Sequence, residues 1–208
     1  MNTPTKTTYD ALQAAYDNFN KLLFAGHLPG CLITLQRKKN CYGYHAHERF
    51  GDKEGNVVCN EISLNPDYFD RDSKAILSTL AHEMCHLQQD CFGKPTRKGY
   101  HDKAWGALME AIGLIPSSTG AAGGKKTGQK VSHYIEKDGK FDIVVDAFLE
   151  AGFDTLLIDL WAKNKLTTKP KAESKTKYLC PSCGLNAWAK PYSTLVCGDC
   201  QITMPADI

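Results

Sequence analysis

The residues best suited to chemistry are two histidines and a glutamate within one short run. His82 and His86 are four residues apart, and Glu83 directly follows the first of them. Apolar residues at positions 76, 77, 80, 84 and 87 recur at helical spacing, so both imidazoles project from the same side of a helix and can share one metal ion. Glu83 can then reach a water on that metal without binding the metal. The H-E-x-x-H pattern therefore predicts two Zn²⁺ ligands and a general base, the core of a zinc hydrolase.

Chance placement on a solvated helix face, or a satisfied pair in the core, is the alternative for these residues. The neighbours Ala81, Met84, Cys85 and Leu87 are small or apolar, so the segment is expected to be buried. Two buried imidazoles and a carboxylate without partners would carry a large desolvation cost. A bound metal removes that cost, and we therefore interpret the run as a zinc site.

A third protein ligand is needed, since a catalytic zinc has three protein ligands and a water. The extended pattern H-E-x-x-H-x-x-G-x-x-H is absent, because Gln89 and Phe92 stand where Gly and His are required. His101 is our prediction, because it starts a second helix directly after the loop that must fold back over the site. Glu110 is the alternative, as a carboxylate ligand.

Length and charge limit the class of protein. A chain of 208 residues has room for one good core and a small appendage, and a net charge of +2 does not by itself indicate a nucleic-acid binder. The sequence contains no run of eighteen apolar residues, so we expect no membrane span. The first six residues lack the apolar core of a signal peptide. We therefore expect a cytoplasmic monomer in which disulfides are unfavourable.

The nine cysteines fall into two groups. Five are scattered, and we interpret them as small buried hydrophobes: Cys31, Cys41, Cys59, Cys85 and Cys91. Four form two C-x-x-C pairs with thirteen residues between them: Cys180, Cys183, Cys197 and Cys200. In a reducing compartment that spacing predicts a structural Cys₄ zinc site, so the chain should hold one catalytic and one structural Zn²⁺.

The fold class expected from the pattern is α+β. A helix over 8–25 and strand-like runs at 31–36, 41–46 and 57–64 predict a small antiparallel sheet with the motif helix packed behind it. The Gly- and Lys-rich residues 117–140 predict a mobile loop, apart from a short strand at 131–135. Helices are expected from Phe141 to Ala151 and over the apolar run 153–161.

Three parts follow along the chain. Residues 1–162 are expected to form the domain that carries the histidines. Residues 163–177 contain six Lys against one Glu, which is typical of a solvated basic linker. Residues 178–208 are expected to form the zinc ribbon.

Several short motifs, and their order along the chain, resemble those of SprT-like proteins, the group that includes the Spartan protease. They are the runs 20–29, 61–66, 80–86 and 101–105, with Gly113-Leu114 after them. The C-terminal four-cysteine ribbon is similar to one appended to many bacterial members. The resemblance implies a zincin-like metalloprotease domain with ligands His82, His86 and His101 and general base Glu83. It also implies work on DNA-associated proteins, since Spartan-type members degrade proteins crosslinked to DNA.

Further roles are open at this stage. Tyr100, His133 and Tyr134 are candidates, by residue type, for the donor that stabilises the oxyanion of peptide hydrolysis. Asp102 or Glu110 could orient a ligand imidazole by accepting its second N–H, or could simply be solvated surface carboxylates.

DNA is the expected partner besides a protein substrate, because lysines cluster at 94–103, 125–140 and 163–177. Phosphate contacts by such groups weaken steeply with salt. Trp188 and Tyr192 with Lys190 between them resemble a basic-aromatic surface for nucleic acid. Two alternatives remain: a non-catalytic zinc-containing DNA-binding or regulatory protein, and a peptidase that acts without DNA.

Overall fold

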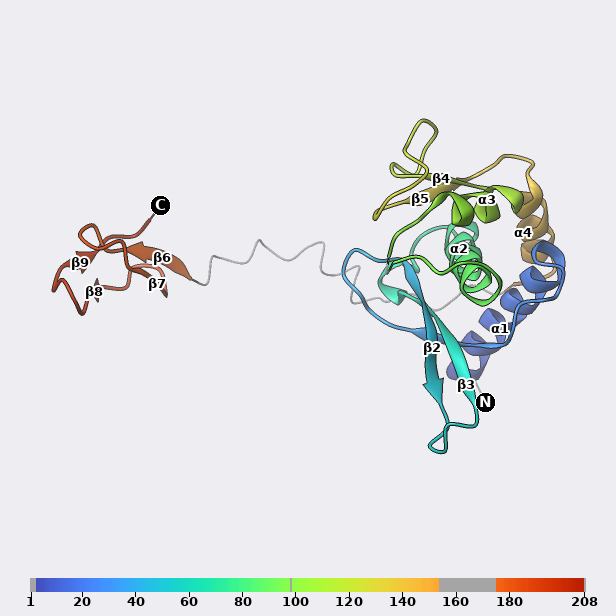
Figure 1. The fold of residues 1–208 in the computed structure, drawn as a ribbon, viewed down its shortest axis with the longest axis horizontal. Coiled ribbons are helices and arrows are strands. Elements are labelled where there is room, and N and C mark those ends of the chain that lie inside the picture. Colours follow the sequence, from blue (N-terminus) through green and yellow to red (C-terminus); the bar gives the residue numbers. More distant parts are fainter. Residues whose placement is uncertain (1–2, 98, 154–174, 208) are drawn as a thin grey trace. The chain divides into compact units, whose positions relative to one another are not determined.

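The computed structural model describes residues 3–97, 99–153 and 175–207 (Figure 1). The chain separates into two compact units, Met1–Asp159 and Leu160–Ile208. The helix expected over 153–161 and most of the expected linker 163–177 fall outside the described residues. No helix in the described ranges has both the length and the apolar content that crossing a bilayer requires.

The first unit is a mixed α+β structure in which α2 lies centrally, between the sheet and the other helices (Figure 1). Its elements, in chain order, are α1 Pro4–Leu23, β1 Cys31–Leu35, β2 Gly43–Gly51, β3 Val58–Leu64, the 3₁₀ turn Pro66–Tyr68, α2 Ser73–Phe92, α3 Lys103–Ala111, β4 Leu114–Ser117, β5 Ser132–Ile135 and α4 Lys140–Glu150.

The three-stranded sheet has the order β1-β3-β2. β2 pairs with β3 antiparallel, as expected for a hairpin, but β1 pairs with β3 in parallel, so the prediction of an antiparallel sheet was wrong for this pair. The chain between β1 and β2 passes across the end of the sheet and makes no hairpin there. The Asn65 amide holds this crossing segment by donating to the carbonyls of Lys38 and Cys41, at 2.8 Å each.

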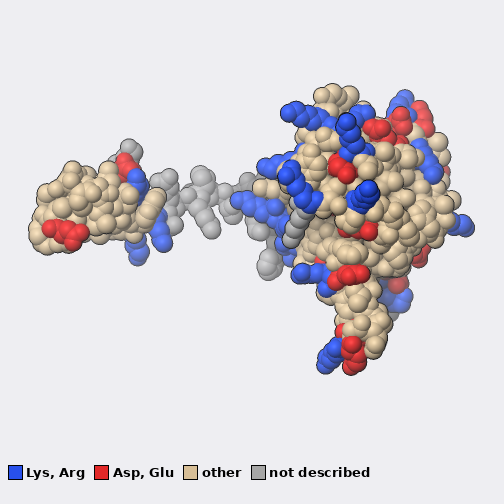
Figure 2. Space-filling view, viewed as in Figure 1, with Lys and Arg blue, Asp and Glu red and all other residues tan. Residues whose placement is uncertain are grey.

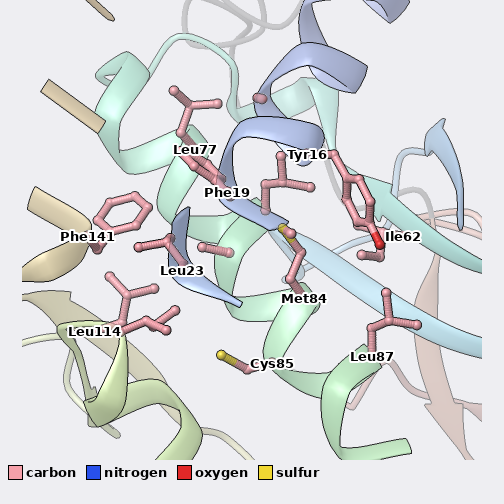
Figure 3. Close-up of a cluster of buried hydrophobic side chains, with 14 of the residues drawn as sticks. Tyr16, Phe19, Leu23, Ile62, Leu77, Met84, Cys85, Leu87, Leu114 and Phe141 are labelled. Carbon is pink, nitrogen blue, oxygen red and sulfur yellow. The ribbon is translucent and has the colours of Figure 1, made fainter. Parts of the chain in front are cut away.

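α1 packs against α4 and α2 in the core of the unit (Figure 3). The helix begins earlier than predicted because Pro4, which lacks an N–H, fits the first turn. Phe19 is fully buried and meets Phe141 of α4 edge to face, with ring centroids 5.6 Å apart. Each such buried ring stabilises the fold by about 1.5–3 kcal/mol. The helix predicted from Phe141 is confirmed as α4.

Of the five scattered cysteines, only Cys85 is fully buried. Cys31, Cys41, Cys59 and Cys91 are half-buried, so the prediction of burial was wrong for these four, although Cys31 and Cys91 still pack against the core. Cys31 and Cys59 lie on β1 and β3, Cys91 lies in the last turn of α2, and Cys41 lies between β1 and β2.

α2 has two faces with opposite roles. Asp72 caps its N-terminus by accepting from the Ala75 N–H at 3.4 Å, and the helix ends at Gly93. One face is fully buried in the core and carries Leu77, Leu80, Met84 and Leu87, three of which are labelled in Figure 3. At 100° per residue, positions 78, 82 and 86 then lie on the opposite face. Core packing of the leucines thus fixes which way the two histidines point.

The hairpin of β4 and β5 carries the Gly- and Lys-rich loop, residues 118–131. We expected this loop to be mobile, but it is hydrogen-bonded at several points. Ser118 N–H donates to the Lys125 carbonyl at 2.9 Å. His101 and Gly128 exchange both backbone hydrogen bonds, at 2.9 and 3.0 Å. The loop is therefore attached to the segment that precedes α3.

The second unit consists of two short hairpins, formed by β6 Thr176–Leu179 with β7 Asn186–Ala189 and by β8 Leu195–Val196 with β9 Thr203–Met204. β6 starts inside the segment predicted as linker. The buried hydrophobic side chains of the unit are Tyr178, Cys180, Cys197 and Met204. The Tyr178 hydroxyl donates to the Lys190 carbonyl and accepts from the Ser193 N–H, both at 3.0 Å.

Candidate metal centres

Three histidines from two elements converge in the first unit. His82 and His86 come from α2, and His101 lies directly before α3. One ring nitrogen of each lies within 4.8 Å of the others, close enough for one ion to bind all three. The two backbone hydrogen bonds with Gly128 hold His101 in place. No fourth protein donor joins this histidine cluster among the described residues.

Trp105, on the first turn of α3, packs against all three imidazoles. Its ring centroid lies 4.9 Å from that of His82, 5.1 Å from that of His86 and 4.3 Å from that of His101. Burial among these rings lowers the pKa of His82 well below its usual value, that of His86 to about 3, and that of His101 also. The imidazoles are therefore neutral near pH 7, which is the form that binds a metal.

A hydrogen-bonded chain orients His82. Its Nδ1 lies 3.0 Å from His133 Nδ1, and His133 Nε2 lies 2.9 Å from the Ser78 hydroxyl. Ser78 in turn donates to the Ala75 carbonyl at 2.9 Å. If His82 Nε2 keeps its lone pair for a metal, only one direction is consistent: His82 donates to His133, and His133 donates to Ser78. His101 is oriented in the same way, since its Nδ1 lies 3.2 Å from the Gly128 carbonyl.

His133 was one of three candidates for the oxyanion donor, and its hydrogen bonds argue against that role. Both of its ring nitrogens are engaged, one with His82 and one with Ser78, so neither can donate to a substrate oxygen. Burial lowers its pKa to about 4, which keeps the ring neutral. His133 thus orients the His82 imidazole, 51 positions away in the sequence.

The two carboxylates considered for orienting a ligand are engaged elsewhere. Asp102 caps α3 by accepting from the Trp105 N–H at 2.8 Å and also accepts from the Gln89 amide at 2.9 Å. Glu110 is exposed and pairs with Lys126 at 2.6 Å, so it does not belong to the histidine cluster. The orienting acceptors that sequence reasoning missed are His133 and a backbone carbonyl.

Two tyrosines were also considered as oxyanion donors, Tyr100 and Tyr134. Tyr100 precedes His101, and the Arg97 guanidinium lies over its ring at 4.4 Å. Tyr134, on β5, lines a cavity beside α2. Neither has a hydroxyl contact that decides between the two.

Glu83 directly follows His82 on α2 and is 5% exposed. Burial raises the pKa of its carboxyl to about 8, while the backbone N–H of His45, on β2, and the Lys38 ammonium act in the opposite direction. A dication at the cluster would lower this pKa, because it favours the carboxylate form.

His45 was also missed from the sequence. Its Nδ1 lies 3.1 Å from the Asp90 carboxylate, its side chain is nearly buried, and its Nε2 has no hydrogen-bond partner in the part of the chain that the structure describes.

The four C-terminal cysteines form a second cluster, with all Sγ atoms within 4.8 Å of one another. The two C-x-x-C turns repeat the same hydrogen bonds. Gly184 N–H donates to Cys180 O at 3.0 Å, and Gln201 N–H donates to Cys197 O at 2.8 Å. Backbone N–H groups at the first turn lower the pKa of the Cys180 thiol to about 7. Four converging thiols are the donor set of a structural zinc site.

Comparison with known families assigns the first unit. The model of the SprT-like family matches residues 12–124, more than half of the chain. The chain belongs to the SprT-like family. The SprT-like region contains Glu83 and the three clustered histidines, whereas His133 and the four-cysteine cluster lie beyond it.

One curated relative of this chain is the "Uncharacterized protein in mucB 3'region" of Salmonella typhimurium. It is 53% identical over 62 residues, which are 30% of this chain and 84% of that protein. No solved structure matches the chain significantly.

Proposed function

We propose that the first unit is a zinc-dependent endopeptidase of zincin type that hydrolyses DNA-associated proteins, including proteins crosslinked to DNA. The observation that carries the proposal is the histidine cluster: three neutral imidazoles converge, no further protein donor is added from the described residues, and the buried Glu83 directly follows the first histidine on α2. A structural site would be closed by a fourth protein ligand, and would have no use for a free carboxylate.

The donor set fits zinc, for which three imidazoles with an open position are a known catalytic arrangement. Zn²⁺ bound there would supply Lewis-acid chemistry, lowering the pKa of a water and polarising the peptide carbonyl. Glu83 accepts a proton from the attacking water and delivers it to the leaving amine. His133 and the Gly128 carbonyl keep two of the imidazoles oriented.

DNA as the partner is supported by charge and by exposed aromatic groups. Figure 2 shows Lys and Arg side chains flanking the β4–β5 hairpin, whose loop contains Lys125, Lys126 and Lys130. Lys126 is paired with Glu110, which leaves the loop with a net positive charge. In the second unit, Trp188 is 64% exposed and Tyr192 fully exposed, as stacking platforms for unpaired bases are.

The test uses one protein substrate in two forms, free and covalently crosslinked to single-stranded DNA. Wild type should cleave the crosslinked form faster, and the advantage should fall steeply with salt. Glu83→Gln should keep its zinc and lose about 10²–10⁴-fold in rate, the usual contribution of a general base. Glu110→Gln, at an exposed glutamate, is the matched control and should retain full rate.

Each alternative gives a distinct result. Equal cleavage of both substrate forms, unaffected by added DNA, would identify a DNA-independent peptidase. DNA binding and two zinc ions without any cleavage would identify a non-catalytic DNA-binding protein. Full activity in Glu83→Gln would remove the proposed mechanism.

A further inference from the structure

A cavity of about 210 Å³ lies beside the N-terminal half of α2 and is not used in the mechanism above. Its walls come from α2, from β5 and from the segments before β2 and α2. The polar residues among them are Tyr42, Arg71, Ser78, Thr79, Ser132, His133 and Tyr134. Small-molecule sites usually measure about 300–1,000 Å³, so this cavity is of a size for a single side chain.

The cavity is next to the histidine cluster. Ser78 lies four residues before His82 on α2, and therefore one turn along the same helix face. His133 belongs to the wall of the cavity and also touches His82, with 3.0 Å between their Nδ1 atoms. Only one imidazole thus separates the cavity from a metal ligand. A peptide whose scissile bond lies at the cluster would place a neighbouring side chain here.

Arg71 gives the cavity its charge. Its Nε donates to the Tyr68 carbonyl at 3.2 Å and its Nη2 donates to the Thr79 hydroxyl at 3.1 Å. The guanidinium also lies over the Tyr42 ring at 4.0 Å. These contacts hold the planar group in one orientation. A guanidinium has five N–H donors in all, and the two bonds to Tyr68 and Thr79 use two of them.

No carboxylate within the described ranges forms an ion pair with Arg71, although several of the other cations in this unit have one, such as Lys74 with Asp142 at 2.7 Å. The neighbouring Asp70 attracts the guanidinium electrostatically but lies beyond ion-pair distance. A half-buried, immobilised guanidinium without an ion-pair partner favours an anion from outside, because desolvation strengthens the attraction. A carboxylate can accept two parallel N–H bonds from such a group.

We propose that this cavity binds the side-chain carboxylate of a substrate residue directly flanking the scissile bond, with Arg71 as its counter-charge. The inference rests on the proposed peptidase function and adds to it a substrate class: sequences with Asp or Glu next to the cleaved bond. Arg71 is then a specificity-determining residue.

The experiment compares matched peptides that differ only by Glu or Gln, placed on either side of the cleaved bond. Wild type should cleave the Glu peptide with a kcat/KM higher by roughly 10- to 100-fold at one of the two positions, since Gln lacks the charge. Arg71→Gln should bring this ratio close to one. Arg37→Gln, which removes an exposed arginine paired with Asp67 at 2.9 Å, should leave the ratio unchanged.

The ratio is measured within each variant, so a loss of folded protein does not alter it. Arg71→Lys keeps the charge without the planar fork and should give an intermediate ratio, which provides a second variant if Arg71→Gln is too unstable. A purely structural role of Arg71, as a brace between Tyr68 and Thr79, would lower stability and leave the ratio unchanged, which would overturn the proposal.

A binding measurement separates this inference from the proposed function. In Glu83→Gln with zinc, a fluorescent Glu peptide should bind more tightly than its Gln partner, and Arg71→Gln should remove the difference. If wild type cleaves no peptide, the peptidase function fails, and the binding difference still decides the cavity. Equal binding of both peptides, or equal cleavage by wild type, would contradict the assignment.

Discussion

The histidine cluster and the cysteine cluster are assembled in opposite ways. The three histidines come from α2 and from the segment before α3, and they are oriented by groups on the β4–β5 hairpin. The four cysteines come from two local turns with the same hydrogen bonds. The first cluster has three donors and a neighbouring carboxylate, and the second has four donors and no carboxylate in its group.

The two units differ in whether the fold supports the cluster or the cluster supports the fold. In the first unit an extensive hydrophobic core holds α2, and the histidines project from its far face. In the second unit the buried hydrophobic set is small and includes Cys180 and Cys197, two of the four clustered cysteines. We therefore expect the first unit to fold without a metal and the second unit to depend on one.

Removal of metal should give the largest effect and should separate the two units. A chelator is expected to unfold the ribbon, because structural zinc sites contribute about 10–16 kcal/mol of binding free energy to folding. The first unit should keep its helices. The chemical shifts of the indole N–H groups report on both units. The shift of Trp188 should move to its value in unfolded chains, and the shift of the buried Trp105 should keep its native value.

Point variants sharpen the same contrast. Cys197→Ser and His101→Ala should each lose one zinc per chain, but only Cys197→Ser should unfold the unit that carries it. A ribbon that stays folded after chelation would contradict the dependence described here, as would loss of the first unit's helices.

His133 should have an intermediate effect, confined to the histidine cluster. His133→Ala removes the acceptor for the His82 N–H, and loss of such an orienting group typically weakens metal affinity about 10- to 100-fold. His133→Asn should restore part of the affinity, since its amide oxygen falls near the position of Nδ1. Competition with a chromophoric chelator measures both affinities.

The matched control is His47→Ala, at a half-exposed histidine on β2. It should leave both affinities unchanged. Unchanged zinc affinity in His133→Ala would show that the contact with His82 does not position the ligand.

The smallest effect concerns the two cysteine turns. Gly184 and Gln201 occupy equivalent positions, and both have positive φ, at 74° and 57°. A non-glycine residue in this region costs about 1 kcal/mol, so Gln201→Gly should stabilise the ribbon by that amount and Gly184→Ala should destabilise it by a similar amount. Urea denaturation of the zinc-bound ribbon, followed by Trp188 fluorescence, gives both values. A destabilised Gln201→Gly would show that its side chain matters more than its backbone.

Patterns that are local in the chain were predictable. The spacing of His82 and His86 is set by one helix, and the apolar positions of that helix indicated which face would be buried. The capping of α2 by Asp72 and the extent of α4 follow from residues within a few positions of each other. The C-x-x-C spacing is equally local.

Contacts between distant segments were not predictable. The role of His133 depends on the β4–β5 hairpin packing on α2, and nothing within a few residues of His133 indicates His82 as its neighbour. The parallel pairing of β1 with β3 depends on the path of the segment between β1 and β2. Gly128 is one glycine among many in its loop, and only the folded chain shows that its carbonyl orients His101.

The double backbone link between His101 and Gly128 bears on how this chain tolerates change. Glycine-rich surface loops normally accept insertions and deletions with little consequence. Here the segment from 118 to 131 is closed onto the third imidazole, so altering its length by even one residue shifts the register at Gly128. We therefore expect an insertion or deletion in this loop to weaken metal binding at the histidine cluster before it disrupts the loop itself.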